Sequence, residues 1–330
     1  MRVLHLDAGK TMRGGQWQAL RLIQALQWGG PGDPPLPWVG LPSSESTLLA
    51  RLGSPLFEAA VQAGIHVEPL GLIRAALLAR RHDLIHAHDS RSPTLAALVG
   101  GAPLVVSRRV AFSWSGLPSL PRRRPCRRSS LPPATANWKY ARPARYIAVS
   151  EFVKSVLLRR GVPADKIAVV YDGVPLLDDS APVDAPPRIL APANADDPRK
   201  GAALALEAAR LAGVELHLSD NLERDLPGAS LFLYITHSEG LGSGALLAMS
   251  AGVPVIASNV GGLPEILRHG ENGWLVENTP DAIAAAIRRF QSDPALARGL
   301  GRAGRRTVVE RFTIERMVRR TMEVYMQVLQ

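Results

Sequence analysis

SEGLGSGALLAMSAGVPVIASNVGGLPEI, residues 238–266, decides the fold of this chain. Its pattern predicts a loop, a helix, a strand, a glycine-rich turn and the start of a second helix. Glu239 and the glycines Gly240, Gly242 and Gly244 stand where a strand ends and a helix begins. Free N–H groups at a helix N-terminus bind phosphate, and glycine lets the phosphate approach closely. Because a carboxylate repels phosphate, we expect Glu239 to contact neutral hydroxyl groups, and the combination predicts a nucleotide-sugar site.

This segment resembles the donor-binding signature of the retaining GT-B glycosyltransferases of group 1, also called family 4. The resemblance implies an α/β chain of the GT-B class, with two Rossmann-like domains facing a central cleft. It also implies transfer of a sugar, with retention, from a nucleotide-diphosphate donor to a glycan or lipid-linked acceptor of the cell envelope. Such enzymes need no metal and no other cofactor.

One position departs from the family pattern. The pattern has a second glutamate eight residues after the first, for the ribose hydroxyls, and Leu247 stands there. Leucine accepts no hydrogen bond, and losing a charge-assisted one costs about 1.5–3 kcal/mol. Two alternatives therefore stand beside each other: an enzyme with altered donor binding, or a weakened or inactive relative that binds a sugar nucleotide or a partner without turnover. A GT-B epimerase fits the segment less well.

The resemblance implies further residues of the donor site. Lys200, in Asp196-Asp-Pro-Arg-Lys-Gly201, matches a lysine that neutralises the leaving diphosphate, and with Glu239 it forms the expected catalytic pair. Asn194 stands where one subgroup has an arginine. The other residues expected at the donor are Gly14, Gly15, Gly240, Leu241, Gly242, Ser243, Leu247 and Glu265.

Polar residues that follow two strands of the first half are expected on the acceptor side: His88, Asp89, Arg108 and Arg109. Many family members carry a histidine near Arg109, so an arginine there predicts an anionic acceptor or an altered site. The spacing of His86 and His88 suits a metal, but a polar histidine at a strand end is commoner, and we expect no metal.

Short apolar runs alternate with helical patterns along the chain, which predicts parallel sheets covered by helices. We expect an N-terminal Rossmann-like domain over residues 1–173, a proline-rich linker over 174–187, and a C-terminal Rossmann-like donor domain over 188–312. Residues 313–330 are expected to form a helix, and the resemblance implies that this helix packs back on the first domain. The stretch between Gly213 and Leu231 has room for one strand and one helical turn, so the second domain is shortened.

Composition bounds the remaining questions. The single cysteine, Cys126, excludes an internal disulfide, and the lack of a long apolar run favours a cytoplasmic protein. The net charge is +10, and residues 90–150 contain eleven basic residues and no acidic one. We expect no nucleic-acid partner. We predict that residues 108–145 contact the anionic surface on the inner face of the cell membrane. The alternative is that they form a solvated loop without a partner. The base, the sugar, the acceptor and the oligomeric state stay open.

Overall fold

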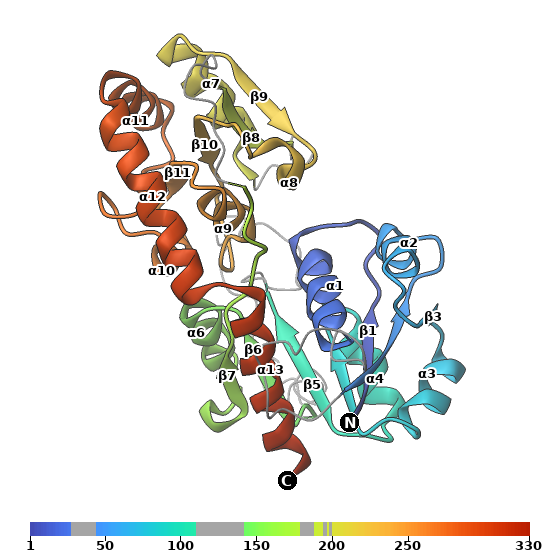
Figure 1. The fold of residues 1–330 in the computed structure, drawn as a ribbon. Coiled ribbons are helices and arrows are strands. Elements are labelled where there is room, and N and C mark those ends of the chain that lie inside the picture. Colours follow the sequence, from blue (N-terminus) through green and yellow to red (C-terminus); the bar gives the residue numbers. More distant parts are fainter. Residues whose placement is uncertain (28–43, 110–141, 179–187, 194–196, 198–199) are drawn as a thin grey trace, which may run out of the picture.

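The computed structural model describes residues 1–27, 44–109, 142–178, 188–193, 197 and 200–330. These residues form two parallel β-sheets with helices on their faces (Figure 1). The first sheet has the order β3-β2-β1-β4-β5-β6-β7 and the second β12-β11-β10-β8-β9. The predicted fold class, GT-B with two Rossmann-like domains, is thereby confirmed.

The strands of the first sheet are β1 (Arg2–Asp7), β2 (Glu45–Ala50), β3 (Val67–Pro69), β4 (Leu84–Ala87), β5 (Leu104–Arg108), β6 (Arg145–Ala148) and β7 (Ile167–Val169). Those of the second are β8 (Ile189–Pro192), β9 (Leu216–Ser219), β10 (Leu231–Tyr234), β11 (Val255–Ser258) and β12 (Trp274–Val276). The helices of the first half are α1 (Gly14–Gln27), α2 (Pro55–Gln62), α3 (Leu72–Ala79), α4 (Ser92–Val99) and α6 (Glu151–Arg159). Those of the second half are α7 (Ala202–Ala212), α8 (Leu222–Asp225), α9 (Ser243–Ser250), α10 (Leu263–Ile266), α11 (Pro280–Ser292), α12 (Pro294–Arg311) and α13 (Ile314–Leu329).

Two helices of the first domain begin after serine N-caps. Ser54 Oγ accepts a hydrogen bond from Phe57 N (3.3 Å), and Ser150 Oγ accepts one from Val153 N (3.0 Å). Each cap satisfies a backbone donor that the first helical turn leaves free. Both caps lie at the carboxyl ends of strands, where the chain turns back along the sheet.

The last helix, α13, returns to the first sheet and lies beside α1 (Figure 1). Its buried Met322 and Tyr325 share an apolar cluster with Val3 and Leu84 of the sheet. The segment that leaves the first domain and the segment that returns to it lie side by side, since Val174 N donates a hydrogen bond to Phe312 O at 3.0 Å. The first domain is thus completed by the C-terminal residues of the chain.

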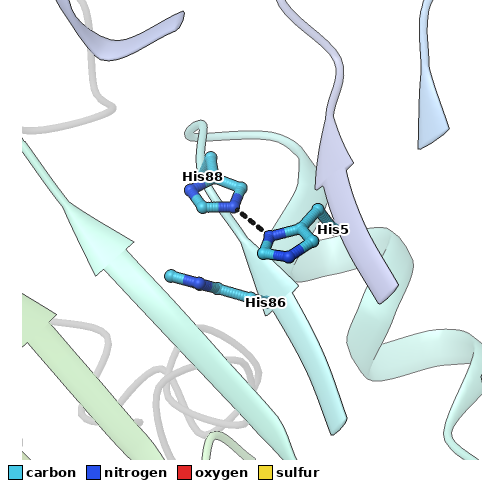
Figure 2. A group of neighbouring side chains, drawn as sticks. All are labelled: His5, His86 and His88. Carbon is cyan, nitrogen blue, oxygen red and sulfur yellow. Dashed lines mark hydrogen bonds between the residues drawn. The ribbon is translucent and has the colours of Figure 1, made fainter. Parts of the chain in front are cut away.

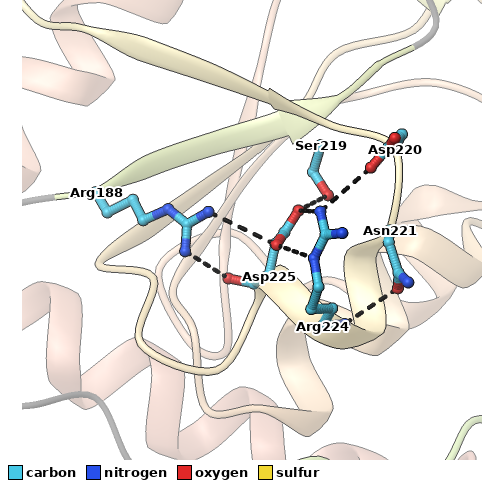
Figure 3. Close-up of polar contacts among 6 residues, drawn as sticks. All are labelled: Arg188, Ser219, Asp220, Asn221, Arg224 and Asp225. Carbon is cyan, nitrogen blue, oxygen red and sulfur yellow. Dashed lines mark hydrogen bonds and ion pairs between the residues drawn. The ribbon is translucent and has the colours of Figure 1, made fainter.

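The second domain is compact where the sequence predicts a shortening. Between β9 and β10 the chain forms only α8, and Asp225 at its end holds this segment to the sheet (Figure 3). Its carboxylate accepts hydrogen bonds from Arg224 Nε and Ser219 Oγ, both at 2.8 Å. These bonds, from Arg224 first, lower the pKa of Asp225 to about 2. Arg188 at the start of the second sheet also contacts this carboxylate, at 3.7 Å.

Candidate functional site

Glu239 is held in one position by three hydrogen bonds. Lys200 Nζ and Tyr234 OH each donate to Oε2 at 2.8 Å, and Gly240 N donates to Oε1 at 3.0 Å. Burial, and then the charge of Glu239, raise the pKa of Tyr234 well above its usual value, so the phenol stays a donor. The residues predicted as the catalytic pair are therefore an ion pair, oriented by a tyrosine that the sequence analysis missed.

Two helix N-termini meet beside this pair. Helix α9 begins at Ser243. The N-cap residue before it, Gly242, has a φ of 111° and no side chain that could accept a hydrogen bond from the first helical turn. Gly14 opens α1, and a Cβ atom added there would lie 2.8 Å from Ser243 Oγ. Each N-terminus offers backbone donors and the positive end of a helix dipole. With the ammonium of Lys200 close by, this arrangement can hold a group with several negative charges.

Glycines let the loop at Glu239 lie between two other segments. A Cβ atom on Gly240 would stand 2.0 Å from the carbonyl oxygen of Arg109, and one on Gly261 would stand 2.0 Å from that of Glu239. Gly240 O also accepts a hydrogen bond from Ser150 Oγ at 2.6 Å. The loop of the second domain is thus fixed directly against the end of β5 and the start of α6.

Glu265, which is predicted to contact the donor, forms hydrogen bonds with residues of the first domain. Its carboxylate accepts hydrogen bonds from Glu151 N and Phe152 N, both at 2.8 Å, and from Tyr171 OH at 3.1 Å. It therefore caps α6 of the first domain, because the free N–H groups of that helix attract a carboxylate. These hydrogen bonds join the two domains, and the contact of Glu265 with a donor stays a prediction.

Of the other predicted donor residues, Gly15 approaches the acceptor side, since an added Cβ would lie 3.7 Å from Arg109 Cδ. Leu241 and Leu247 are buried in the main apolar cluster, with exposed fractions of 2% and 7%. Leu247 thus packs as a core residue of α9, which differs from the predicted contact with a donor. Asn194 lies outside the described residues.

On the acceptor side, Arg109 forms a nearly buried ion pair. Its Nε lies 3.1 Å from Asp172 Oδ1, while its Nη1 is buried and has no hydrogen-bond partner among the described residues. Burial raises the pKa of Asp172, and the guanidinium opposes that shift. Arg108 is the last residue of β5. Asp89 accepts hydrogen bonds from the backbone at the start of α4, so its carboxylate orders that helix.

His88 points into the sheet and not toward an open site. His5 Nδ1 and His88 Nε2 share a hydrogen bond of 2.9 Å, and His86 stands beside them (Figure 2). Both nitrogens of His86 are engaged, by Tyr325 OH at 2.5 Å and by Ser107 Oγ at 2.8 Å. Nitrogens of the three rings lie within 4.8 Å of one another, a spacing that allows a metal. Binding one would break hydrogen bonds of His86, so the contacts favour a network that joins β1, β4, β5 and α13.

Asp7 is a polar residue of this region that the sequence analysis missed. It ends β1 and accepts hydrogen bonds from Gly9 N at 2.7 Å and Gln16 Nε2 at 3.1 Å. Burial, and then the charge of Asp89, raise the pKa of Asp7 to about 6. A polar residue directly after a buried strand was the signal that singled out His88, and it would have found Asp7 as well.

The buried histidines predict a loss of stability in mild acid. Burial lowers the pKa of His5 from 6.5 to about 3, and those of His86 and His88 fall well below 6.5. Below pH 6.5 the unfolded chain therefore binds more protons than the folded protein. For each of these histidines, the free energy of unfolding falls by about 1.4 kcal/mol for each unit by which the pH is lowered. The pKa of Asp7, raised to about 6, acts in the opposite direction below that pH, and the raised pKa of Asp172 has the same sign as that of Asp7.

Because three histidines outweigh two carboxyl groups, we expect lower urea midpoints at about pH 5.5 than at about pH 7.5. His86→Gln removes one of these proton-binding groups and should make the free energy of unfolding less dependent on pH. Equal stability at both pH values would contradict the neutral, buried state of the cluster.

Comparison with known proteins decides the family. The family described as glycosyl transferases group 1 matches residues 204–307, and that described as glycosyltransferase family 4 matches residues 36–176. The two matches fall on the second and first sheets, respectively. The chain belongs to the GT-B glycosyltransferases of group 1, or family 4. Within the described ranges, every helix of this family-4 chain is too short or too polar to span a lipid bilayer.

Curated relatives match parts of the chain. N-acetyl-alpha-D-glucosaminyl L-malate synthase of Bacillus anthracis is 36% identical over 112 residues, which cover 33% of this chain and 29% of the relative. D-inositol 3-phosphate glycosyltransferase of Streptomyces avermitilis is 38% identical over 103 residues, 31% of this chain and 22% of the relative. In each match the chain therefore spans less than a third of the relative's length.

Solved structures share the whole fold. Anabaena Alr3699/HepE in complex with UDP superposes with a TM-score of 0.79 over 99% of this chain and 100% of that one, at 16% identity. A glycosyltransferase from Rickettsia africae gives a TM-score of 0.75 over 100% of this chain and 98% of that one, at 17% identity. At such identities the similarity establishes the fold alone.

Proposed function

We propose that this family-4 chain transfers a sugar from a nucleoside-diphosphate sugar to an acceptor, at the junction of its two domains. The observation that carries the proposal is the meeting of two helix N-termini, at Gly14 and Ser243, next to the Lys200–Glu239 pair. Backbone donors and an ammonium suit a diphosphate, and a fixed carboxylate suits sugar hydroxyls. Anabaena Alr3699/HepE, which shares the fold, has been solved with UDP and with UDP-glucose, and this supports the assignment.

In this proposal the diphosphate leaves with its charge neutralised by the two helix N-termini and Lys200. Preorganised donors of this kind lower the barrier, because they need no reorientation as charge develops. Glu239 orients the transferred sugar. The proposal needs no metal or other cofactor. The anomeric configuration is retained if the acceptor attacks from the face of the sugar that the phosphate leaves and the leaving phosphate takes the acceptor's proton.

The acceptor is proposed to be a glycan or lipid-linked molecule of the cell envelope. Arg109, whose Nη1 has no described partner, favours a negatively charged acceptor. Most arginines of the basic segment predicted to contact a membrane lie in residues 110–141, outside the described part of the chain, so that prediction stands on the sequence. A second candidate is a relative without turnover, because Leu247 packs in the core and offers no hydrogen bond to a ribose.

Product analysis separates the two candidates. The protein is incubated with UDP-, GDP- and ADP-sugars, with and without a lipid extract as acceptor, and release of the nucleoside diphosphate is followed. We expect one donor to be consumed faster when acceptor is present, and the anomeric configuration of the product to match that of the donor. Tight nucleotide binding without any consumption of donor would support the non-catalytic candidate instead.

A further inference from the structure

Helix α3 exposes large apolar side chains. Leu72, Ile73 and Leu77 are 57%, 77% and 57% exposed, and Leu98 on the neighbouring α4 is 64% exposed. The fully buried residues of α3 are both alanines. A surface helix usually places its large apolar residues inward and its polar residues outward, and α3 does the opposite. Exposed apolar residues grouped in this way mark an interaction surface.

Arginines border these apolar side chains. Arg74 lies on α3 and pairs with Glu68 at 3.1 Å, and Arg80 and Arg81 follow the helix directly. Both Arg80 and Arg81 are exposed, and neither forms an ion pair with a described residue. We call the four apolar residues and these three arginines the α3–α4 face.

An open pocket of about 440 Å³ adjoins the start of α3. It is lined by Ala8, Arg51, Leu52, Leu70 and Arg91. Arg51 and Arg91 are exposed, and their guanidinium groups make no ion pair within the described ranges. The pocket lies at the carboxyl ends of β1, β2 and β3, the edge of the sheet on which α1 also begins. The pocket thus places two further arginines beside the start of α3, while Arg80 and Arg81 lie at the other end of this helix.

We propose that the α3–α4 face docks on the surface of an anionic lipid bilayer. Leu72, Ile73 and Leu77 would enter the boundary between headgroups and acyl chains, as the apolar side of an interfacial helix does. The bordering arginines would lie at the level of the lipid phosphates, where each cation adds attraction that salt screens. Charge decides against a second copy of the chain, because two such faces would bring unpaired arginines together.

Leu70 lines the pocket two residues before Leu72, so docking through the start of α3 would bring Arg51 and Arg91 close to the bilayer. Their guanidinium groups could then contact a lipid phosphate. Docking does not require glycosyl transfer, so it can be measured separately from the proposed function.

Flotation with lipid vesicles tests the proposal. The protein should float with phosphatidylcholine vesicles that contain roughly 30% phosphatidylglycerol, less with phosphatidylcholine alone, and less as salt rises. Leu72→Ser/Ile73→Ser/Leu77→Ser should weaken apparent binding by about tenfold or more, since exposed side chains drive interfacial insertion. Arg80→Ser/Arg81→Ser should weaken it and reduce its dependence on salt.

Matched controls use exposed leucines elsewhere. Leu206 and Leu211 on α7 are 45% and 37% exposed, so Leu206→Ser/Leu211→Ser should leave vesicle binding unchanged. All variants alter exposed side chains and should keep the melting temperature and nucleotide binding of the unaltered protein.

Three outcomes would overturn the proposal. The first is no flotation with anionic vesicles at low salt. The second is flotation that depends on the arginines at 122–128 and is indifferent to the α3 substitutions. The third is self-association that the α3 substitutions abolish, with no binding to lipid.

Discussion

Glu239→Gln is expected to lower the rate of sugar transfer by about 10²–10³-fold, the usual cost of one preorganised polar contact in an active site. The carboxylate accepts hydrogen bonds from Lys200, Tyr234 and Gly240 N, so its orientation is set before any ligand binds. An amide keeps the shape of the side chain but removes the charge that balances Lys200. Initial rates at saturating donor, together with the affinity for the nucleoside diphosphate, measure the effect.

A matched control is Glu215→Gln, because Glu215 lies in the same domain with an 82% exposed side chain. It should leave the rate unchanged. The catalytic assignment of Glu239 is wrong if its glutamine variant folds normally and transfers sugar within a few-fold of the original rate.

Gly261→Ala is expected to destabilise the protein by about 3 kcal/mol or more, because strain and a clash add together at this position. Gly261 has a φ of +60°, and an added Cβ would lie 2.0 Å from the carbonyl oxygen of Glu239. The clash involves backbone, so the loop that carries Glu239 must move. We therefore expect nucleotide affinity to fall together with the free energy of unfolding in urea.

Gly270→Ala separates strain from clash. Gly270 has a similar φ of +77°, but nothing lies within 4 Å of its added Cβ. It should cost only about 1–2 kcal/mol and leave nucleotide affinity unchanged. Equal losses in the two variants would show that the close packing of Gly261 on Glu239 is unimportant.

Much of the fold followed from the sequence because the alternation of short apolar runs with helical patterns is a local signal. Strand β2 and helix α3 could not be predicted from the sequence, for physical reasons. Strand β2 follows a stretch rich in proline, glycine and serine that gives no period. Helix α3 has one charged residue, Arg74, among apolar ones, so its sequence shows no clear separation of a polar and an apolar face. The same property that hid α3 makes its exposed face informative once the helix is placed.

The Glu239–Lys200 pair could be predicted from a motif, but its surroundings could not. Tyr234 lies in a buried strand whose sequence does not reveal that its hydroxyl reaches Glu239. Glu265 meets Glu151 N and Phe152 N, which are more than a hundred residues away along the chain. Contacts of this kind depend on how the two domains sit together, and a single sequence contains no local signal for that.

The most direct measurement of the central claim is an equilibrium titration with nucleoside diphosphates. UDP, GDP and ADP are added to the unaltered protein and to Lys200→Ala, and melting temperatures are followed. Ligand that binds the folded state at a hundredfold excess over its Kd stabilises it by about 2.7 kcal/mol. We predict that at least one nucleoside diphosphate raises the melting temperature of the unaltered protein and that Lys200→Ala loses most of the rise. No shift with any of them at millimolar concentration, or an equal shift in Lys200→Ala, would contradict a nucleotide site beside the Lys200–Glu239 pair.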